Sequence, residues 1–163
     1  MKELPEILKT LYDAQLEFVV IGGAAMHLQG SAYVTQDVDF CYARTPQNIK
    51  RLATALQPHH PTLRGAPTDL PFTFDARTIK QGMNFTLSTD LGDLDFLGEV
   101  TGLGLYEKVK AAADIRIIDG MHIAVLSLVG LIKSKKAAGR EKDLYVLPEL
   151  EALEQLKRKT GAK

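Results

Sequence analysis

The sequence predicts a single α/β domain, because short apolar, β-branched segments alternate along the chain with segments of helical periodicity. Its 163 residues are enough for one domain with a substantial hydrophobic core. Hydrophobic residues make up 45% of the chain and charged residues 25%, which are ordinary values for a globular protein. The sequence has no internal repeat or low-complexity segment, so we expect one domain over 1–163, with its core at about 17–125 and C-terminal helices at about 127–158.

The first half of the chain is expected to hold two strands and three helices. The segment 18–21, Phe-Val-Val-Ile, has the β-branched, apolar composition of a buried strand. Gly22-Gly23 breaks this strand, and Thr45-Pro46 is the N-cap and N1 pair that commonly begins a helix. The expected elements are helices over 5–15, 24–29 and 46–56 and strands over 18–21 and 38–42.

The second half begins with a proline-rich segment, since 58–71 holds four of the seven prolines and is predicted to be a long, stiffened loop. Asp119-Gly120 lies between two apolar segments and predicts a hairpin turn. Ser127 is placed to cap a helix, and Pro148 is expected to begin the last one. The expected elements are strands over 85–88 and 94–97, strands on either side of 119–120, and helices over 105–112, over 127–138 and from 148 onward.

Composition narrows the classes of partner. Twenty basic residues balance twenty acidic ones, so no overall field attracts nucleic acid or an anionic membrane. No apolar segment approaches the ~18–20 residues of a membrane span, and the first residues do not resemble a signal peptide. Because Cys41 is the one cysteine, it has no internal disulfide partner. These features predict a cytoplasmic protein that does not bind membranes.

Two pairs of aspartates are the strongest candidates for chemistry. Asp37 and Asp39 lie two residues apart on an expected strand, so their side chains point to the same face. Carboxylates this close repel each other unless a cation lies between them, and oxygen ligands favour a divalent ion such as Mg²⁺ or Mn²⁺. Asp93 and Asp95 repeat this spacing on another expected strand. If the two strands are neighbours, Asp95 joins Asp37 and Asp39 at a site for one or two metal ions.

Two glycines precede the first aspartate pair. Gly22 and Gly23 let the backbone approach a phosphate closely, which suits a metal-dependent nucleotide site. Simpler interpretations stay open for each motif. The glycines could form only a tight turn, Asp37 and Asp39 could be surface charges on an edge strand, and Asp93 could belong to a turn.

A third motif lies in the segment 131–144. It carries Lys135, Arg140 and Lys142, and lysine and arginine are the usual partners of phosphate groups. The simpler interpretation is a solvated basic helix face on which Asp143 serves as an ion-pair partner.

Together these motifs resemble the polymerase-β-type nucleotidyltransferase superfamily. Within it, the chain is most similar to small bacterial proteins related to the nucleotidyltransferase toxins of abortive-infection systems. The resemblance covers roughly residues 17–155. The residues that carry it are Gly22-Gly23-x-Ala25, Gly30-Ser31, Thr35-x-Asp37-Val-Asp39, Asp95 and the segment Leu131-Ile-Lys-Ser-Lys135-Lys-Ala-Ala-Gly139-Arg140-Glu-Lys142-Asp143-Leu.

The resemblance implies a mixed-sheet α/β core that transfers a nucleoside monophosphate from an NTP, such as ATP, to a hydroxyl group and releases pyrophosphate. It implies that Asp37, Asp39 and Asp95 are catalytic and hold Mg²⁺ or Mn²⁺, with Asp95 also assisting deprotonation of the acceptor hydroxyl. The nucleotide-binding residues that it implies are Gly22, Gly23, Ser31, Lys135, Arg140 and Lys142.

The chain differs from many relatives at Tyr33, where they carry an arginine two residues before the threonine. It also lacks a clear helical substrate-binding domain, so acceptor recognition is assigned to 58–71, the C-terminal helices, or a partner chain or second copy. The acceptor itself stays open among tRNA, a protein side chain and a small molecule. The alternative function is a non-catalytic nucleotide- or partner-binding module, such as one component of a toxin–antitoxin pair.

Overall fold

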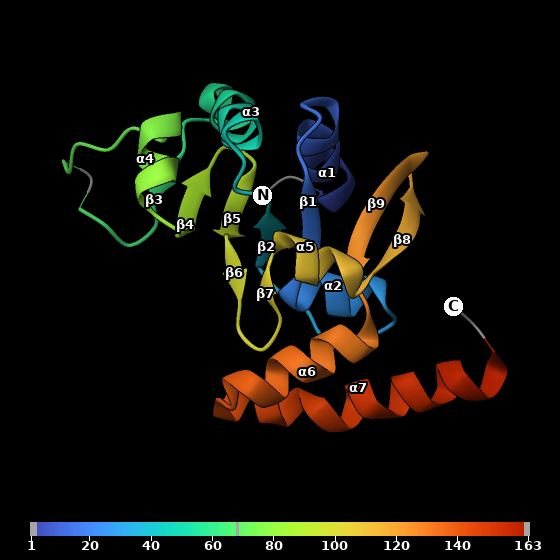
Figure 1. Cartoon of the computed structure of the whole chain (residues 1–163). Helices are drawn as coiled ribbons and strands as arrows, with labels where there is room; N and C mark the ends of the chain where they lie inside the picture. Colours follow the sequence, from blue (N-terminus) through green and yellow to red (C-terminus); the bar gives the residue numbers. More distant parts are fainter. Residues whose placement is uncertain (1–2, 68, 162–163) are drawn as a thin grey trace.

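A seven-stranded mixed sheet forms the centre of the computed structural model, which describes residues 3–67 and 69–161 (Figure 1). The strand order is β3-β4-β5-β2-β1-β9-β8. Strands of this sheet are β1 (Phe18–Ile21), β2 (Asp37–Tyr42), β3 (Thr62–Leu63), β4 (Asn84–Thr89), β5 (Gly92–Leu97), β8 (Ala113–Ile118) and β9 (Met121–Leu126). A separate pair is formed by β6 (Glu99–Val100) and β7 (Gly104–Leu105). The predicted α/β fold class is confirmed.

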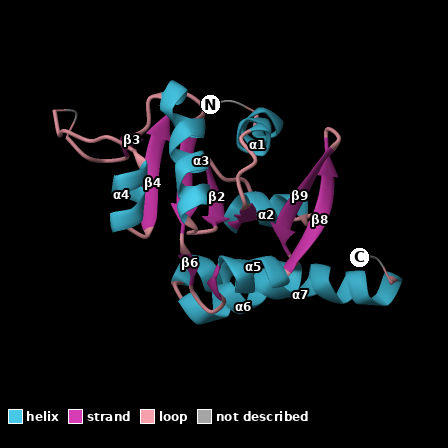
Figure 2. Ribbon diagram, turned by 45° about the horizontal axis from the view of Figure 1, so that its top comes forward, coloured by secondary structure: helices cyan, strands magenta, loops and turns pink. Residues whose placement is uncertain are grey.

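The helices lie on either side of this sheet and across one end of it (Figure 2). They are α1 (Leu4–Asp13), α2 (Gly22–Leu28), α3 (Pro46–Leu56), α4 (Ala76–Gln81), α5 (Tyr106–Ala111), α6 (Leu128–Ala138) and α7 (Glu141–Thr160), with a 3₁₀ turn at Gln57–His59. In both views α6 and the long α7 run side by side below the sheet (Figure 1 and Figure 2). No helix in the described part of the chain combines the length and apolar composition needed to cross a membrane.

The strands in the middle of the sheet are those whose residues form the hydrophobic core. All four residues of β1 are buried, as is the aromatic pair Phe40 and Phe96, whose rings stack with centroids 5.2 Å apart. Phe40 and Phe96 stand opposite each other because β2 and β5 run parallel in register. β1 also runs parallel to β9, whereas the other strand pairs are antiparallel. A strand buried on both faces must be apolar, so charged residues on β2 and β5 are confined to one end.

Several local predictions are confirmed. β1 has the predicted bounds, and α3 begins at Pro46 after a cap in which the Thr45 hydroxyl accepts the Asn48 N–H at 3.2 Å. Asp119 and Gly120 have positive φ angles of 49° and 80°, as the turn of a two-residue hairpin requires. These features depend on neighbouring residues alone, which is why sequence patterns identify them.

The prediction that Pro148 begins the last helix is wrong. The α7 helix begins at Glu141, and Pro148 lies inside it. At its start the Asp143 carboxylate accepts the Arg140 backbone N–H at 3.2 Å, which satisfies a group that the helix leaves free. The proline removes one backbone donor, and burial of the helix face that includes Leu147 and Leu150 offsets that loss.

Two further predictions need correction. The segment 58–71 is not wholly a loop, because β3 lies within it and pairs with β4. Gly22 and Gly23 end β1 as predicted, but the helix expected to begin at Ala24 begins at Gly22, so the two glycines are the first residues of α2. The helix α4 and the short pair β6 and β7 were not predicted. These elements are two to six residues long, too short for a periodic pattern to identify them.

Candidate functional site

Four aspartates gather at one end of β2 and β5. The parallel register places Asp37 opposite Asp93 and Asp39 opposite Asp95. One carboxylate oxygen from each of Asp37, Asp39 and Asp95 lies within 4.8 Å of the other two. The two aspartate-bearing strands, β2 and β5, are therefore neighbours, which is the condition for Asp95 to join Asp37 and Asp39. Asp93 belongs to β5 itself and not to the preceding turn, so the turn interpretation of this residue is wrong.

Asp39 has a strongly shifted pKa within this acidic cluster. Burial, together with the charges of Asp95 and Asp37, raises the pKa of Asp39 from 3.8 to about 7. Its Oδ1 atom is buried and accepts no hydrogen bond from any residue that the structure describes. A buried carboxylate oxygen without a donor is unfavourable by itself, and a divalent cation with oxygen ligands would satisfy it. The donor set therefore fits Mg²⁺ or Mn²⁺.

The two glycines make room for this cluster. Gly22 has a φ of 62°, and a Cβ atom at this position would collide with the Asp39 carboxylate. A Cβ atom at Gly23 would come within 2.8 Å of the Thr35 Cβ. Thr35 in turn donates its hydroxyl to Asp37 Oδ1 at 2.8 Å. The glycine motif thus permits the close approach of the aspartate segment, and its contact with phosphate stays a prediction.

Arg64 belongs to the site, although it was not among the predicted site residues. Its guanidinium forms an ion pair with Asp95, lies 3.4 Å from Asp37 Oδ2, and places Nε 3.8 Å from Asp93 Oδ2. Arg64 follows β3, in the segment that was predicted to be loop. No local pattern marks an arginine as the partner of aspartates 27 to 31 residues away, since only the pairing of β3 with β4 brings it there.

A basic cluster lies on α6 and at the start of α7. Asp143 is fully buried and accepts hydrogen bonds from Lys135 Nζ at 3.2 Å and from Arg140 Nε at 2.6 Å. Lys135 and Arg140 also line a small cavity of about 130 Å³ together with Gly22 and Asp39. The fold therefore brings the glycine, acidic and basic motifs to one place.

Two predicted nucleotide-binding residues lie elsewhere. Lys142 is exposed and does not line this cavity. Ser31 is buried, donates its hydroxyl to Glu149 on α7 and accepts the Tyr33 N–H at 3.0 Å. Both assignments stay predictions, and the contacts of Ser31 give it a structural task in joining the loop before β2 to α7.

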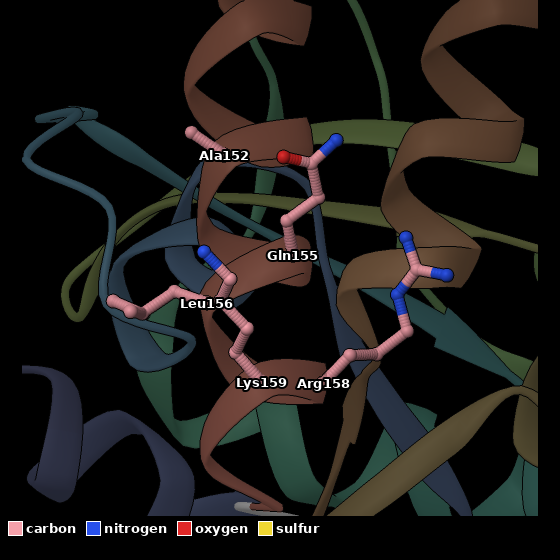
Figure 3. Close-up of a pocket in the computed structure, with 5 residues that line it drawn as sticks. All are labelled: Ala152, Gln155, Leu156, Arg158 and Lys159. Carbon is pink, nitrogen blue, oxygen red and sulfur yellow. The ribbon is translucent and has the colours of Figure 1, made fainter.

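A larger but open surface pocket, of about 580 Å³, lies along the outer part of α7 (Figure 3). It is lined only by residues of that helix: Ala152, Gln155, Leu156, Arg158 and Lys159. None of the aspartates described above lines it. The small cavity beside Asp39 is therefore the better candidate for chemistry, despite its size.

Comparison with known proteins supports the fold. No protein-family model matches the chain, and no curated protein sequence matches it. The solved structures that resemble it include ANT(2″)-Ia, an aminoglycoside nucleotidyltransferase in complex with adenylyl-2″-tobramycin, with 13% identity and a TM-score of 0.53 over 96% of this chain and 95% of that one. A provisionally assigned nucleotidyltransferase from Thermotoga maritima matches 98% of this chain and 96% of its own, with 16% identity and a TM-score of 0.49. The likeness to ANT(2″)-Ia identifies a nucleotidyltransferase-like fold.

Proposed function

We propose that this protein is a divalent-metal-dependent nucleotidyltransferase that moves a nucleoside monophosphate from an NTP to a hydroxyl acceptor and releases pyrophosphate. One observation carries the proposal. Asp37, Asp39 and Asp95 converge within 4.8 Å on a nucleotidyltransferase-like fold, with one buried Asp39 oxygen lacking a donor among the described residues. Such a cluster is unfavourable for folding, which favours a functional explanation of it.

The carboxylates have separate tasks in this proposal. Asp37 and Asp39 hold Mg²⁺ or Mn²⁺, and Thr35 keeps the Asp37 carboxylate in place through its hydroxyl. Asp95 completes the ligand set and accepts the proton of the attacking hydroxyl. The bound metal would supply charge neutralisation of the triphosphate and of the leaving pyrophosphate.

The remaining predicted residues bind the nucleotide in this proposal. Gly22 and Gly23 bring backbone close to the phosphates, and Lys135 and Arg140 face them from the small cavity. Asp143 holds the Lys135 and Arg140 side chains in place, so that both are preorganised before a nucleotide binds. Ser31 and Lys142 are also assigned to the nucleotide, Lys142 from an exposed position outside the small cavity.

The acceptor is proposed only as a class. The structural neighbour solved with adenylyl-2″-tobramycin makes a small, hydroxylated molecule the first acceptor to test. A tRNA or a protein side chain would need recognition by the segment 58–71, the C-terminal helices, or a partner chain or second copy. A role as the toxin of a toxin–antitoxin pair predicts growth arrest on expression, and arrest by an Asp39→Asn variant equal to that of the wild type would contradict a catalytic toxin.

The test is calorimetric titration of each of the four common NTPs, with and without Mg²⁺. The wild type is compared with an Asp37→Ala/Asp39→Ala variant and with Asp13→Ala, a control that removes an exposed carboxylate paired with Lys9. We expect Mg²⁺-dependent binding in the wild type and the control but not in the double variant. Labelled NTP would then reveal transfer to candidate acceptors.

Two results would redirect the assignment. Binding without transfer to any acceptor would favour the alternative, a nucleotide-binding module without catalysis. Absence of Mg²⁺-dependent binding for every NTP would contradict the proposed function and leave a partner-binding module.

A further inference from the structure

Arg64 is held beside the acidic cluster by its own backbone. Its N–H donates to the Thr86 carbonyl at 3.0 Å, which extends the pairing of β3 with β4 by one residue. The guanidinium also donates to the Leu87 carbonyl at 3.2 Å, and the side chain is only 26% exposed. These contacts order the side chain, so its position toward the aspartates is built into the fold.

The guanidinium contacts carboxylates that a metal would need. It pairs with Asp95 and lies within 3.4 Å of Asp37, two of the three carboxylates that converge at the candidate metal site. The neighbouring Asp93 approaches it at 3.8 Å. Asp39, by contrast, has no ion pair with Arg64, and its Oδ1 accepts no hydrogen bond within the described ranges. Arg64 therefore neutralises Asp37 and Asp95 but forms no ion pair with Asp39.

A guanidinium and a divalent ion compete when they need the same carboxylates. The positive charge of Arg64 repels an incoming cation, and its hydrogen bonds occupy lone pairs of Asp37 and Asp95. We infer that Arg64 is an internal cation that balances the acidic cluster in the metal-free protein and is displaced from Asp37 and Asp95 when a divalent ion binds. This inference rests on the metal site of the proposed function.

Displacement has a measurable consequence. The Arg64 guanidinium and the divalent ion stabilise the same carboxylates. Removing Arg64 should therefore strengthen metal binding, because the metal ion no longer has to displace the guanidinium. Ion pairs of partly exposed groups are worth up to about a factor of five in an equilibrium constant, so Arg64→Gln should tighten Mn²⁺ binding by about fivefold.

The experiment measures Mn²⁺ alone, without nucleotide, by electron paramagnetic resonance of the free ion. It compares the wild type with Arg64→Gln and with Arg77→Gln, which removes the same charge from an exposed position on α4. We expect tighter binding in Arg64→Gln and unchanged binding in Arg77→Gln. We also expect Mn²⁺ to raise the melting temperature of Arg64→Gln more than that of the wild type.

A second measurement needs no variant of the site. In the nuclear magnetic resonance spectrum of the wild type, the Arg64 Nη1–H and Nη2–H signals should move toward the positions of a solvated arginine as Mg²⁺ is added. A signal that stays unchanged at saturating Mg²⁺ would overturn the inference even if Arg64→Gln does not fold.

The outcomes separate this inference from the proposed function. Equal or weaker Mn²⁺ binding by a folded Arg64→Gln, with binding still lost in Asp39→Asn, would overturn the role of Arg64 and leave the metal site standing. Absence of Mn²⁺ binding in both the wild type and Arg64→Gln would overturn the metal site and the inference together.

Discussion

Two carboxylates near the same small cavity, Asp143 on α7 and Asp39 on β2, have opposite electrostatics. Asp143 is completely buried yet accepts hydrogen bonds from the Lys135 and Arg140 side chains and from the Arg140 backbone. Burial alone would raise its pKa, but these hydrogen bonds outweigh burial and leave the pKa below its ordinary value. For Asp39, burial and neighbouring aspartates act together and raise the pKa to about 7.

The difference separates a structural carboxylate from a candidate binding one. Asp143 has its full set of donors, so it joins α6 to α7 and requires nothing further. Asp39 retains a buried oxygen that no described residue satisfies. Of these two buried carboxylates, Asp143 is fully paired within the fold, whereas Asp39 would be satisfied by a bound cation. Substitution of each residue tests this contrast.

The largest effect is expected from Asp143→Asn. This substitution removes a buried charge that holds two cations, and breaking such a pair typically lowers the free energy of unfolding by about 3 kcal/mol. Urea unfolding at neutral pH would measure the loss. The matched control is Glu151→Gln, which removes an exposed α7 carboxylate paired with the adjacent α6 lysine, Lys136, at 3.6 Å. We expect the control to lose less than about 0.5 kcal/mol, and equal losses would contradict the comparison.

In the metal-free protein, Asp39→Asn should raise the free energy of unfolding instead of lowering it. Because folding raises the pKa from 3.8 to about 7, the folded state binds the proton more tightly, and stability falls as the pH rises through this range. Removing the charge should therefore stabilise the protein, by about 2 kcal/mol at pH 8 and by little near pH 4.

Urea unfolding in the presence of a chelator, between pH 4 and pH 8, would measure this dependence. Asp13→Asn, at an exposed position, should show no comparable pH-dependent gain. If Asp39→Asn raises the free energy of unfolding by the same amount at pH 4 and at pH 8, the raised pKa of Asp39 is contradicted.

The smallest effect concerns the glycine that admits Asp39. Gly22→Ala places a methyl group against the Asp39 carboxylate in a left-handed conformation, whereas Gly120→Ala has a similar conformation with open space around it. Both substitutions should destabilise the protein through the backbone. In thermal unfolding, the loss in the free energy of unfolding should be about 1 kcal/mol larger for Gly22→Ala than for Gly120→Ala. Equal losses in the two variants would mean that the close approach to Asp39 is unimportant.

The α/β fold class and several of its elements were predictable because their signals are local, whereas the nucleotidyltransferase-like fold was implied by the resemblance of the motifs. The composition of β1, the Thr45 cap and the hairpin turn at 119–120 each depend on residues within a few positions. The spacing of Asp37 and Asp39 likewise predicts a shared face from strand geometry alone. The start of α7 was misjudged because the local signal of Pro148 was outweighed by the capping contact of Asp143 and by burial of the helix.

The sequence by itself determined the main elements, the alternation that pairs the aspartates on one face, and the glycines that allow a close approach. The tertiary structure alone decided that β2 and β5 are neighbours in register, that Arg64 reaches their carboxylates, and that Asp143 is satisfied while Asp39 is not. The physical reason is distance along the chain. Turns and caps form between neighbours, whereas the partners of a buried charge are chosen by packing among segments that lie far apart in sequence.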